Sequence, residues 1–277
     1  MTVASPAKIN WFLYVLNKRE DGFHDILSPF QKISLYDSLR FEPADDVLLT
    51  DDSKITDNII LKAVDIMKKH LRDKKRGVHI TINKEIPVSA GLGGGSSDAA
   101  MTLMTLNKLW SLDIGNDELM SVASEIGSDV PFFISDGFSI IKGRGEFIDP
   151  RNVEQTYDIL LVNPGIKIST KWAYENNKDF MDINDENKIA EEFIRSYNNR
   201  DFDSMRNIMS NSLEAPVLKK YPEIKEIKAN LKGAGAQLSL MSGSGSTVFG
   251  VFKDIGSATE AQKYFSEYWT RVVKTLS

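Results

Sequence analysis

The sequence contains no cysteine among its 277 residues, so it offers no disulfide, no thiolate nucleophile and no cysteine-based metal site. Histidine is also scarce, with three in the chain, and there is no His-Glu-x-x-His segment. The Gly-x-Ser-x-Gly elbow of hydrolases and the glycine spacing of a Rossmann fingerprint are missing too. These absences argue against the common metalloenzyme, hydrolase and dehydrogenase patterns.

Long hydrophobic runs are absent as well. The apolar stretch 9–16 is followed by the polar segment 17–21 without a small-residue cleavage site, so we expect a core strand there rather than a targeting segment. No run approaches the roughly 20 apolar residues that a membrane helix requires. We therefore expect a cytoplasmic protein with no membrane partner.

Positive charge is not in excess, because 34 Lys and Arg residues stand against 39 Asp and Glu residues, for a net charge of −5. A protein that grips a phosphate backbone needs clustered positive charge, so we expect no nucleic-acid partner. The basic segment 68–76 is interpreted as a solvated helix end, where cations suit the carboxyl-end dipole. A non-catalytic binder of nucleic acid through this segment stays an alternative.

The hydrophobic pattern mixes helical and strand periodicities, which is typical of an α+β or α/β two-layer chain. Apolar residues from 60 to 71 recur with helical spacing, whereas those in 77–84 alternate as in a half-buried strand, with His79 on its other face. Proline-containing turns near 150–165 predict a boundary between two domains, 1–155 and 156–277. Further strands are expected at 9–17, 26–35, 138–142, 157–163, 237–241, 246–252 and 269–274, and further helices at 101–110, 116–126, 171–178, 185–198, 201–211, 222–233 and 257–267.

The strongest local signal is a glycine-rich loop between an expected strand and an expected helix. Residues without side chains let the backbone take positive φ and approach a ligand closely. The following helix presents unpaired N–H groups and a partial positive charge at its start, so loop and helix together form a natural anion site. No Lys-Ser or Lys-Thr follows, so the loop is not a Walker A motif. The candidate phosphate-binding residues are Pro87, Val88, Ser89, Ala90, Gly91, Leu92, Gly93, Gly94, Gly95, Ser96 and Ser97.

A second loop of glycine and serine lies between the two strands expected at 237–241 and 246–252. Alone it is compatible with a simple hairpin turn, but paired with the first loop it is a candidate second wall of the same phosphate site. Its residues are Ser242, Gly243, Ser244 and Gly245.

Three segments together resemble the GHMP kinase superfamily. Residues 6–10 (PAKIN), 87–100 (PVSAGLGGGSSDAA) and 241–247 (MSGSGST) are similar to its first, second and third motifs, in the correct order. The resemblance implies ATP-dependent phosphoryl transfer by a two-lobe α+β protein. Its N-terminal lobe would be similar to domain 2 of ribosomal protein S5, with the active site in the cleft between the lobes.

Segments 18–31 and 127–133 narrow the resemblance to the branch that phosphorylates the 2-hydroxyl of 4-diphosphocytidyl-2-C-methyl-D-erythritol, in the non-mevalonate route to isoprenoid precursors. The implied partner is a small molecule that carries a cytidine diphosphate group. One alternative is another kinase of the superfamily, acting on homoserine or mevalonate. A non-catalytic nucleotide-binding protein is the other, and the joint presence of Lys8 and Asp129 argues against it.

The resemblance assigns roles to three residues of the reacting centre. Asp129 matches the catalytic aspartate, and phosphoryl transfer needs a base that takes or orients the hydroxyl proton. Lys8 matches the catalytic lysine, whose charge would favour the ionised carboxylate. Asn10 is a candidate substrate-binding residue.

The cytidine-binding residues follow from the same resemblance. His24 matches the residue that reads the cytosine edge, and Phe23 stands where the branch often has a stacking tyrosine. Tyr174 is the candidate for the opposing ring, with Trp172 as its competitor. Residues 242–245 are counted with these substrate contacts. The chain departs from the family at 89–90, where glycines are common and a stiffer backbone is expected.

The resemblance also implies that Mg²⁺ accompanies ATP. A serine of the first loop is one candidate ligand, yet no acidic ligand stands out, so no metal-binding residue is assigned. The chain is expected to act as a monomer or a homodimer.

Overall fold

The computed structural model describes residues 1–51, 58–71 and 76–276. The chain divides into two compact units that interleave along the sequence. The first unit comprises Met1–Ala7, Leu35–Pro87 and Gly93–Asp136, and the second comprises Lys8–Ser34, Val88–Leu92 and Gly137–Ser277. Strands β1 (Thr2–Asn10) and β3 (His24–Ala44) each contribute residues to both units, as does the first glycine loop.

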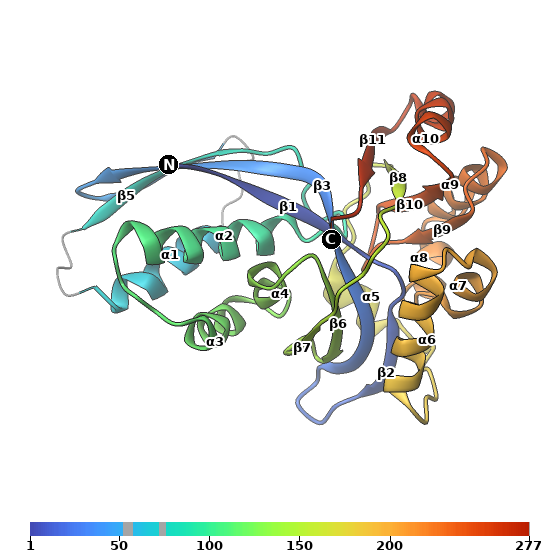
Figure 1. The fold of residues 1–277 in the computed structure, drawn as a ribbon, viewed down its shortest axis with the longest axis horizontal. Coiled ribbons are helices and arrows are strands. Elements are labelled where there is room, and N and C mark those ends of the chain that lie inside the picture. The colour runs from blue at the N-terminus through green and yellow to red at the C-terminus, as the bar shows by residue number, and fades with distance from the viewer. Residues whose placement is uncertain (52–57, 72–75, 277) are drawn as a thin grey trace. The chain divides into compact units, whose positions relative to one another are not determined.

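The first unit combines strands with a group of packed helices (Figure 1). Residues 38–44 of β3 pair antiparallel with β5 (Gly77–Asn83), and β5 pairs parallel with β4 (Val47–Asp51). Helix α2 (Gly94–Leu109) packs against α1 (Ile59–Lys69), α3 (Asn116–Ile126) and α4 (Val130–Ile134). This arrangement places α2, which begins where the first glycine loop ends, beside the short helix α4.

Two periodicity predictions for this unit are confirmed. Helix α1 buries Ile60, Val64 and Met67 on one face, and the Asn58 side chain accepts a hydrogen bond from the Ile60 amide at its start. Strand β5 buries alternate residues, while His79 lies on its other face, 2.9 Å from the Thr50 hydroxyl. The basic segment 68–76 falls partly outside the described residues, at 72–75.

The second unit contains an antiparallel sheet in the order β11-β8-β10-β9. These strands are β8 (Asp158–Asn163), β9 (Leu238–Met241), β10 (Val248–Phe252) and β11 (Trp269–Lys274). The first half of β3 pairs here with β2 (Tyr14–Lys18) and β6 (Phe138–Gly143), and β6 pairs with β7 (Phe147–Pro150). The helices of this unit are α5 (Thr170–Glu175), α6 (Glu186–Asn198), α7 (Phe202–Ile208), α8 (Glu214–Lys220), α9 (Pro222–Gly233) and α10 (Ile255–Gln262), followed by the 3-10 turn η1 (Lys263–Phe265).

An aromatic cluster fills the core of the second unit. The Trp11 ring lies 5.3 Å from the rings of both Tyr157 and Tyr197, in edge-on contacts, and 6.0 Å from Phe193. Phe193 and Tyr197 are one turn apart on α6 and are fully buried. The regular aromatic spacing in this helix therefore serves packing.

Several predicted boundaries are wrong. The strand expected at 9–17 is two strands, because β1 ends at Asn10 and β2 begins at Tyr14. The helix expected at 201–211 ends at Ile208, and Asn211 instead bridges to Leu13. The short elements α4, β7 and α8 were not expected, since each is too brief to show a period of its own. No helix within the described part of the chain is long and apolar enough to cross a membrane.

Replacing a ring of the aromatic cluster tests the packing. Phe193→Ala leaves a cavity among Trp11, Phe12 and Tyr197, so we expect a loss of about 3–5 kcal/mol in the free energy of unfolding. Tyr264→Ala, at a ring that is 72% exposed, is the control and should change it by less than about 0.5 kcal/mol. Urea unfolding measures both variants, and equal effects would contradict the packing role.

Candidate active site

Helix α2 begins at the end of the first glycine loop without a side-chain cap. Its N-cap residue Gly93 has φ of +71°, in the left-handed region that favours glycine, and it has no side chain that could accept a hydrogen bond from the first turn. The amides of Gly94, Gly95 and Ser96 therefore offer donors to an anion at the positive end of the helix dipole. The Ser97 hydroxyl is buried and accepts a hydrogen bond from Ser5 at 2.8 Å, so any ligand must share it.

The middle of the first loop, Val88–Leu92, is in direct backbone contact with the second loop. Gly91 has φ of +78°, and a Cβ atom there would lie 2.0 Å from the Ser242 carbonyl oxygen, so no other residue fits without movement. The Ser242 hydroxyl donates to the Gly91 carbonyl at 2.9 Å, and the Thr247 amide donates to Ala90 at 3.2 Å. The two loops that the sequence marked separately are thus joined in the second unit.

Lys8 and Asn10 belong to the same group of contacts. The Lys8 amide donates to the Leu92 carbonyl at 2.9 Å, and the Lys8 ammonium donates to Asn10 Oδ1 at 2.6 Å. Asn10 Nδ2 in turn donates to the Ser28 hydroxyl at 3.0 Å. Lys8 is 3% exposed, so its charge lies in a low-dielectric environment, where it acts strongly on any anion that enters.

Asp129 lies in the first unit at the N-cap position of α4, the helix that packs against α2. It is half-buried, and its side chain does not form the N-cap hydrogen bond that this position would allow. The Ile59 side chain lies within 4 Å of the Cβ positions built at Gly95 and Gly127. It therefore packs between the start of α2 and the turn that leads to Asp129.

Four aromatic rings mark the region predicted to bind the cytosine. The His24 ring stacks on Tyr174, with centroids 5.1 Å apart, and also faces Phe180 at 6.2 Å. The Phe23 ring is 49% exposed, and the Arg144 guanidinium lies 5.1 Å from its centroid. Trp172, the competitor of Tyr174, instead contacts Tyr221 and the Lys220 ammonium. The structure thus places Tyr174 beside His24.

The turn that carries Phe23 and His24 is held by charged side chains. Asp21 accepts from the Phe23 amide at 3.1 Å, a hydrogen bond that lowers the pKa of its carboxyl. Arg19 binds Asp25 at 2.8 Å through its guanidinium, and its amide donates to the Phe23 carbonyl. Burial lowers the pKa of His24, and the nearby Lys18 charge acts in the same direction. Its imidazole is therefore neutral at physiological pH.

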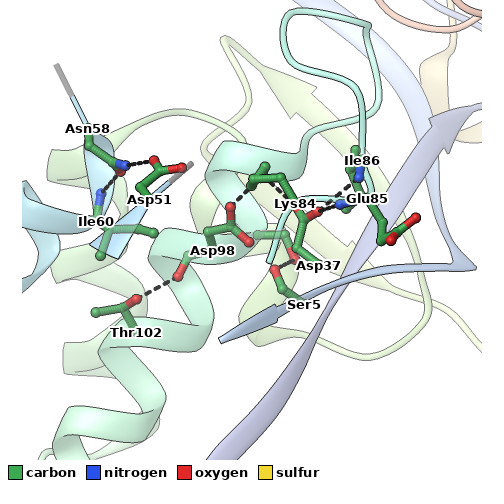
Figure 2. Close-up of polar contacts among 11 residues, drawn as sticks. Ser5, Asp37, Asp51, Asn58, Ile60, Lys84, Glu85, Ile86, Asp98 and Thr102 are labelled. Carbon is green, nitrogen blue, oxygen red and sulfur yellow. Dashed lines mark hydrogen bonds and ion pairs between the residues drawn. The ribbon is translucent and has the colours of Figure 1, made fainter. Parts of the chain in front are cut away.

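Two features of the site are not predicted from the sequence, namely Phe180 and a buried group of charges that adjoins the first loop. Figure 2 shows Lys84 between Asp37 and Asp98, with Lys84 binding the Asp98 carboxylate at 2.7 Å and also donating to Asp37. Asp37 also accepts from the amides of Glu85 and Ile86, at 2.7 and 2.8 Å. This group ties the chain just before Pro87 to the first turn of α2. Asp98 directly follows the two loop serines, the one sequence signal that could have drawn attention to it.

The Asp98 carboxyl is almost fully buried, and its Oδ1 atom accepts no hydrogen bond. Burial raises its pKa to about 6, while the Lys84 ammonium opposes the rise and the Asp37 carboxylate adds to it. The pKa of Lys84 is raised by the same two carboxylates. The group therefore holds two carboxyl groups around one cation, and the Asp98 carboxyl is easier to protonate than an ordinary aspartate.

The two domain models of the GHMP kinases match this chain. The model of the GHMP kinases N terminal domain matches residues 58–137, and that of the GHMP kinases C terminal domain matches residues 189–271. The chain belongs to the GHMP kinase family. As a family member it is an ATP-dependent kinase of a small molecule, with the α+β fold that the three motifs implied.

Relatives and solved structures place the chain within one branch of this family. The 4-diphosphocytidyl-2-C-methyl-D-erythritol kinase of Thermodesulfovibrio yellowstonii is 44% identical over 280 residues, covering 100% of this chain and 98% of the relative. That of Listeria monocytogenes is 40% identical, covering 93% and 89%. A crystal structure of 4-(cytidine 5'-diphospho)-2C-methyl-D-erythritol kinase matches with a TM-score of 0.87 and 29% identity over both full chains. A homoserine kinase from Cytophaga hutchinsonii matches with a TM-score of 0.77 and 15% identity, over 99% of this chain and 94% of that one, which shows the shared fold alone.

Neutralising Asp98 tests the buried charge group. Because the folded pKa lies above the ordinary value of 3.8, the folded protein binds this proton more tightly than the unfolded chain does. The contribution of this group to the free energy of unfolding therefore falls as pH rises from about 4 to above 6. Asp98→Asn removes this pH dependence. The free energy of unfolding of the variant, measured by urea unfolding at several pH values, should therefore increase relative to that of the parent protein as pH rises through this window. Parallel curves would contradict the raised pKa.

Proposed function

We propose that this chain transfers the γ-phosphoryl group of ATP to the 2-hydroxyl of 4-diphosphocytidyl-2-C-methyl-D-erythritol, in the non-mevalonate route to isoprenoid precursors. The observation that carries the proposal is the 44% identity over the whole chain to a kinase named for this substrate. The cluster of His24, Tyr174 and Phe180 supports it, because flat rings and a polar edge are what a pyrimidine base requires.

The phosphates of ATP are assigned to the two joined loops. Phosphoryl transfer depends mainly on positioning and on stabilising charge, and backbone amides held by a glycine loop serve both purposes. The contact between Gly91 and Ser242 supports residues 242–245 as a second wall beside residues 88–92, and the resemblance assigns the triphosphate to residues 87–97. Lys8, tied to Leu92, brings a buried positive charge to this loop.

Asp129 is assigned to the acceptor hydroxyl. A carboxylate at this position takes or orients the hydroxyl proton as the oxygen attacks the γ-phosphorus and ADP leaves. Asn10 accepts a hydrogen bond from the Lys8 ammonium and thereby orients it.

Mg²⁺ fits this site as an ion carried by the nucleotide. Within 1–51, 58–71 and 76–276 there is no group of three or more acidic, histidine or cysteine side chains that could enclose a metal. Mg²⁺ in kinases is usually bound by one or two protein ligands together with substrate phosphates and water. A serine of the first loop is the side chain that would contribute to holding it, and the ion would neutralise charge on the phosphates.

The proposed sequence domains, 1–155 and 156–277, have the support of family matches on either side of their boundary, whereas the two compact units of the fold interleave across it. We place the enzyme in the cytoplasm, where ATP is available, as a monomer or a homodimer. Sedimentation at micromolar concentration distinguishes the two oligomeric states.

A side-by-side assay tests the proposed function. ATP turnover should depend on the cytidine diphosphate substrate and should be absent with homoserine or mevalonate, because these two lack a base for the aromatic cluster. Turnover with either of them, and none with the cytidine compound, would favour another kinase of the superfamily. ATP binding with no acceptor-dependent turnover would instead indicate a nucleotide-binding protein.

Asp129→Asn tests the base. The amide keeps the size of the side chain but cannot take a proton, so we expect kcat to fall by at least about 10²-fold. The Kd for ATP, measured by calorimetry, should stay within a few-fold of the parent value. Retained turnover would show that another group accepts the proton.

His24 gives a prediction about pH. A neutral imidazole has one donor and one acceptor, as the cytosine edge requires, and protonation removes the acceptor. Because burial lowers the His24 pKa below its ordinary value of 6.5, the KM of the cytidine substrate should stay constant down to that pH and rise only below it. The KM of ATP should not rise over the same pH range.

His24→Ala should raise the KM of the cytidine substrate far more than that of ATP and remove the acid rise. An equal rise in the KM of both ligands would contradict the proposal that His24 recognises the cytosine base.

A further inference from the structure

The segment 209–213 leaves the expected helix and runs beside the chain that carries Lys8 and Asn10. The Leu13 amide donates to the Ser210 carbonyl at 2.9 Å, and the Ser212 amide donates to the Leu13 carbonyl at 2.9 Å. Leu13 follows Asn10 by three residues and is buried. This pairing fixes Asn211 at the centre of the second unit, 4% exposed.

Every hydrogen-bonding group of the Asn211 side chain is used. Its Nδ2 atom donates to the carbonyls of Met241 and Gly243, at 2.9 and 2.8 Å, and its Oδ1 atom accepts from the Leu213 amide at 2.9 Å. The Leu213 donor fixes the orientation of the amide, because the reversed one would set two donors against each other. The two carbonyls lie on either side of Ser242, the residue that bonds to Gly91.

Glu214 holds the same loop from its other side. Its carboxylate accepts from the Met241 amide at 2.9 Å and pairs with the Lys228 ammonium at 2.5 Å. Residues 211–214 therefore bind both backbone groups of Met241 and the carbonyl of Gly243. The loop needs such anchors because Gly243 and Gly245, with φ of +56° and +85°, leave its backbone few intrinsic restraints.

We propose that Asn211 is a positioning residue for phosphoryl transfer, which fixes the Ser242–Gly245 loop against the first glycine loop. The inference rests on the proposed function, which assigns both loops to the phosphates of ATP. Asn211 acts through the loop backbone and is assigned no contact with a ligand. A displacement of the loop moves Ser242 from the Gly91 carbonyl and misaligns the wall that faces the triphosphate.

Asn211→Asp is the direct test, since it keeps the shape and removes both donors. A carboxylate would face the two carbonyl oxygens that the amide now binds. Assayed well below the thermal midpoint, kcat should fall by about 10- to 100-fold, with a smaller change in the KM of ATP. Asn199→Asp, at an exposed residue, makes the same change of charge and should leave kcat within about twofold.

Hydrogen exchange measured by mass spectrometry gives a second readout that does not depend on activity. In Asn211→Asp, a peptide covering 241–247 should exchange faster than in the parent protein, while one covering 158–163 should not change. If the aspartate variant does not fold, Asn211→Ser takes its place, because its smaller hydroxyl keeps one donor and should cause the same changes to a lesser degree.

The outcomes separate cleanly. A lower thermal midpoint with unchanged kcat and unchanged exchange at 241–247 would mean that Asn211 only stabilises the fold, and would overturn the inference. Failure of both variants to fold would overturn it as well. If the parent protein shows no turnover with the cytidine substrate, the proposed function fails, and faster exchange at 241–247 still establishes that Asn211 positions the loop.

Discussion

The structure depends on one close approach of two backbones, where Gly91 meets the carbonyl of Ser242. A single added methyl group at Gly91 would lie 2.0 Å from that oxygen, so the contact exists only because both loops are nearly free of side chains. Hydrogen bonds from Ser242 and Thr247 then fasten the loops together, and the Lys8 amide attaches the first motif to Leu92. Three segments that lie far apart in the sequence are thus joined through their backbones, and one of them carries the buried Lys8.

The conformational freedom of the glycine loops has to be limited by other residues, and buried polar side chains do this. Asp37, Lys84 and Asp98 hold the two ends of the first loop in one unit, while Asn211 and Glu214 hold the second loop in the other. Each group is buried and bonded to backbone or to an opposite charge. An unpaired polar group would be energetically costly at these buried positions, so each of these groups has one favoured arrangement. That arrangement restricts the conformation of the loops.

The sequence predicted whatever has a local signature. Helix α1 and strand β5 follow from the spacing of their apolar residues, and the glycine loops follow from composition. The family motifs pointed to Lys8, Asp129 and the cytidine-binding residues, and these assignments stay predictions. Asn211 and Phe180 could not be found in this way. Asn211 meets partners some 30 residues away, and Phe180 lies between α5 and α6, where no periodic pattern marks a ring.

Helix α2 has no side chain of its own that caps its first amides. Most helices begin with a side chain that satisfies the first free amides, worth about 1 kcal/mol, and Gly93 supplies none. Water or a bound anion has to supply the missing acceptor. Under the proposed function a phosphate oxygen of the nucleotide would fill this place, so that binding of the co-substrate would also complete the first turn of the helix.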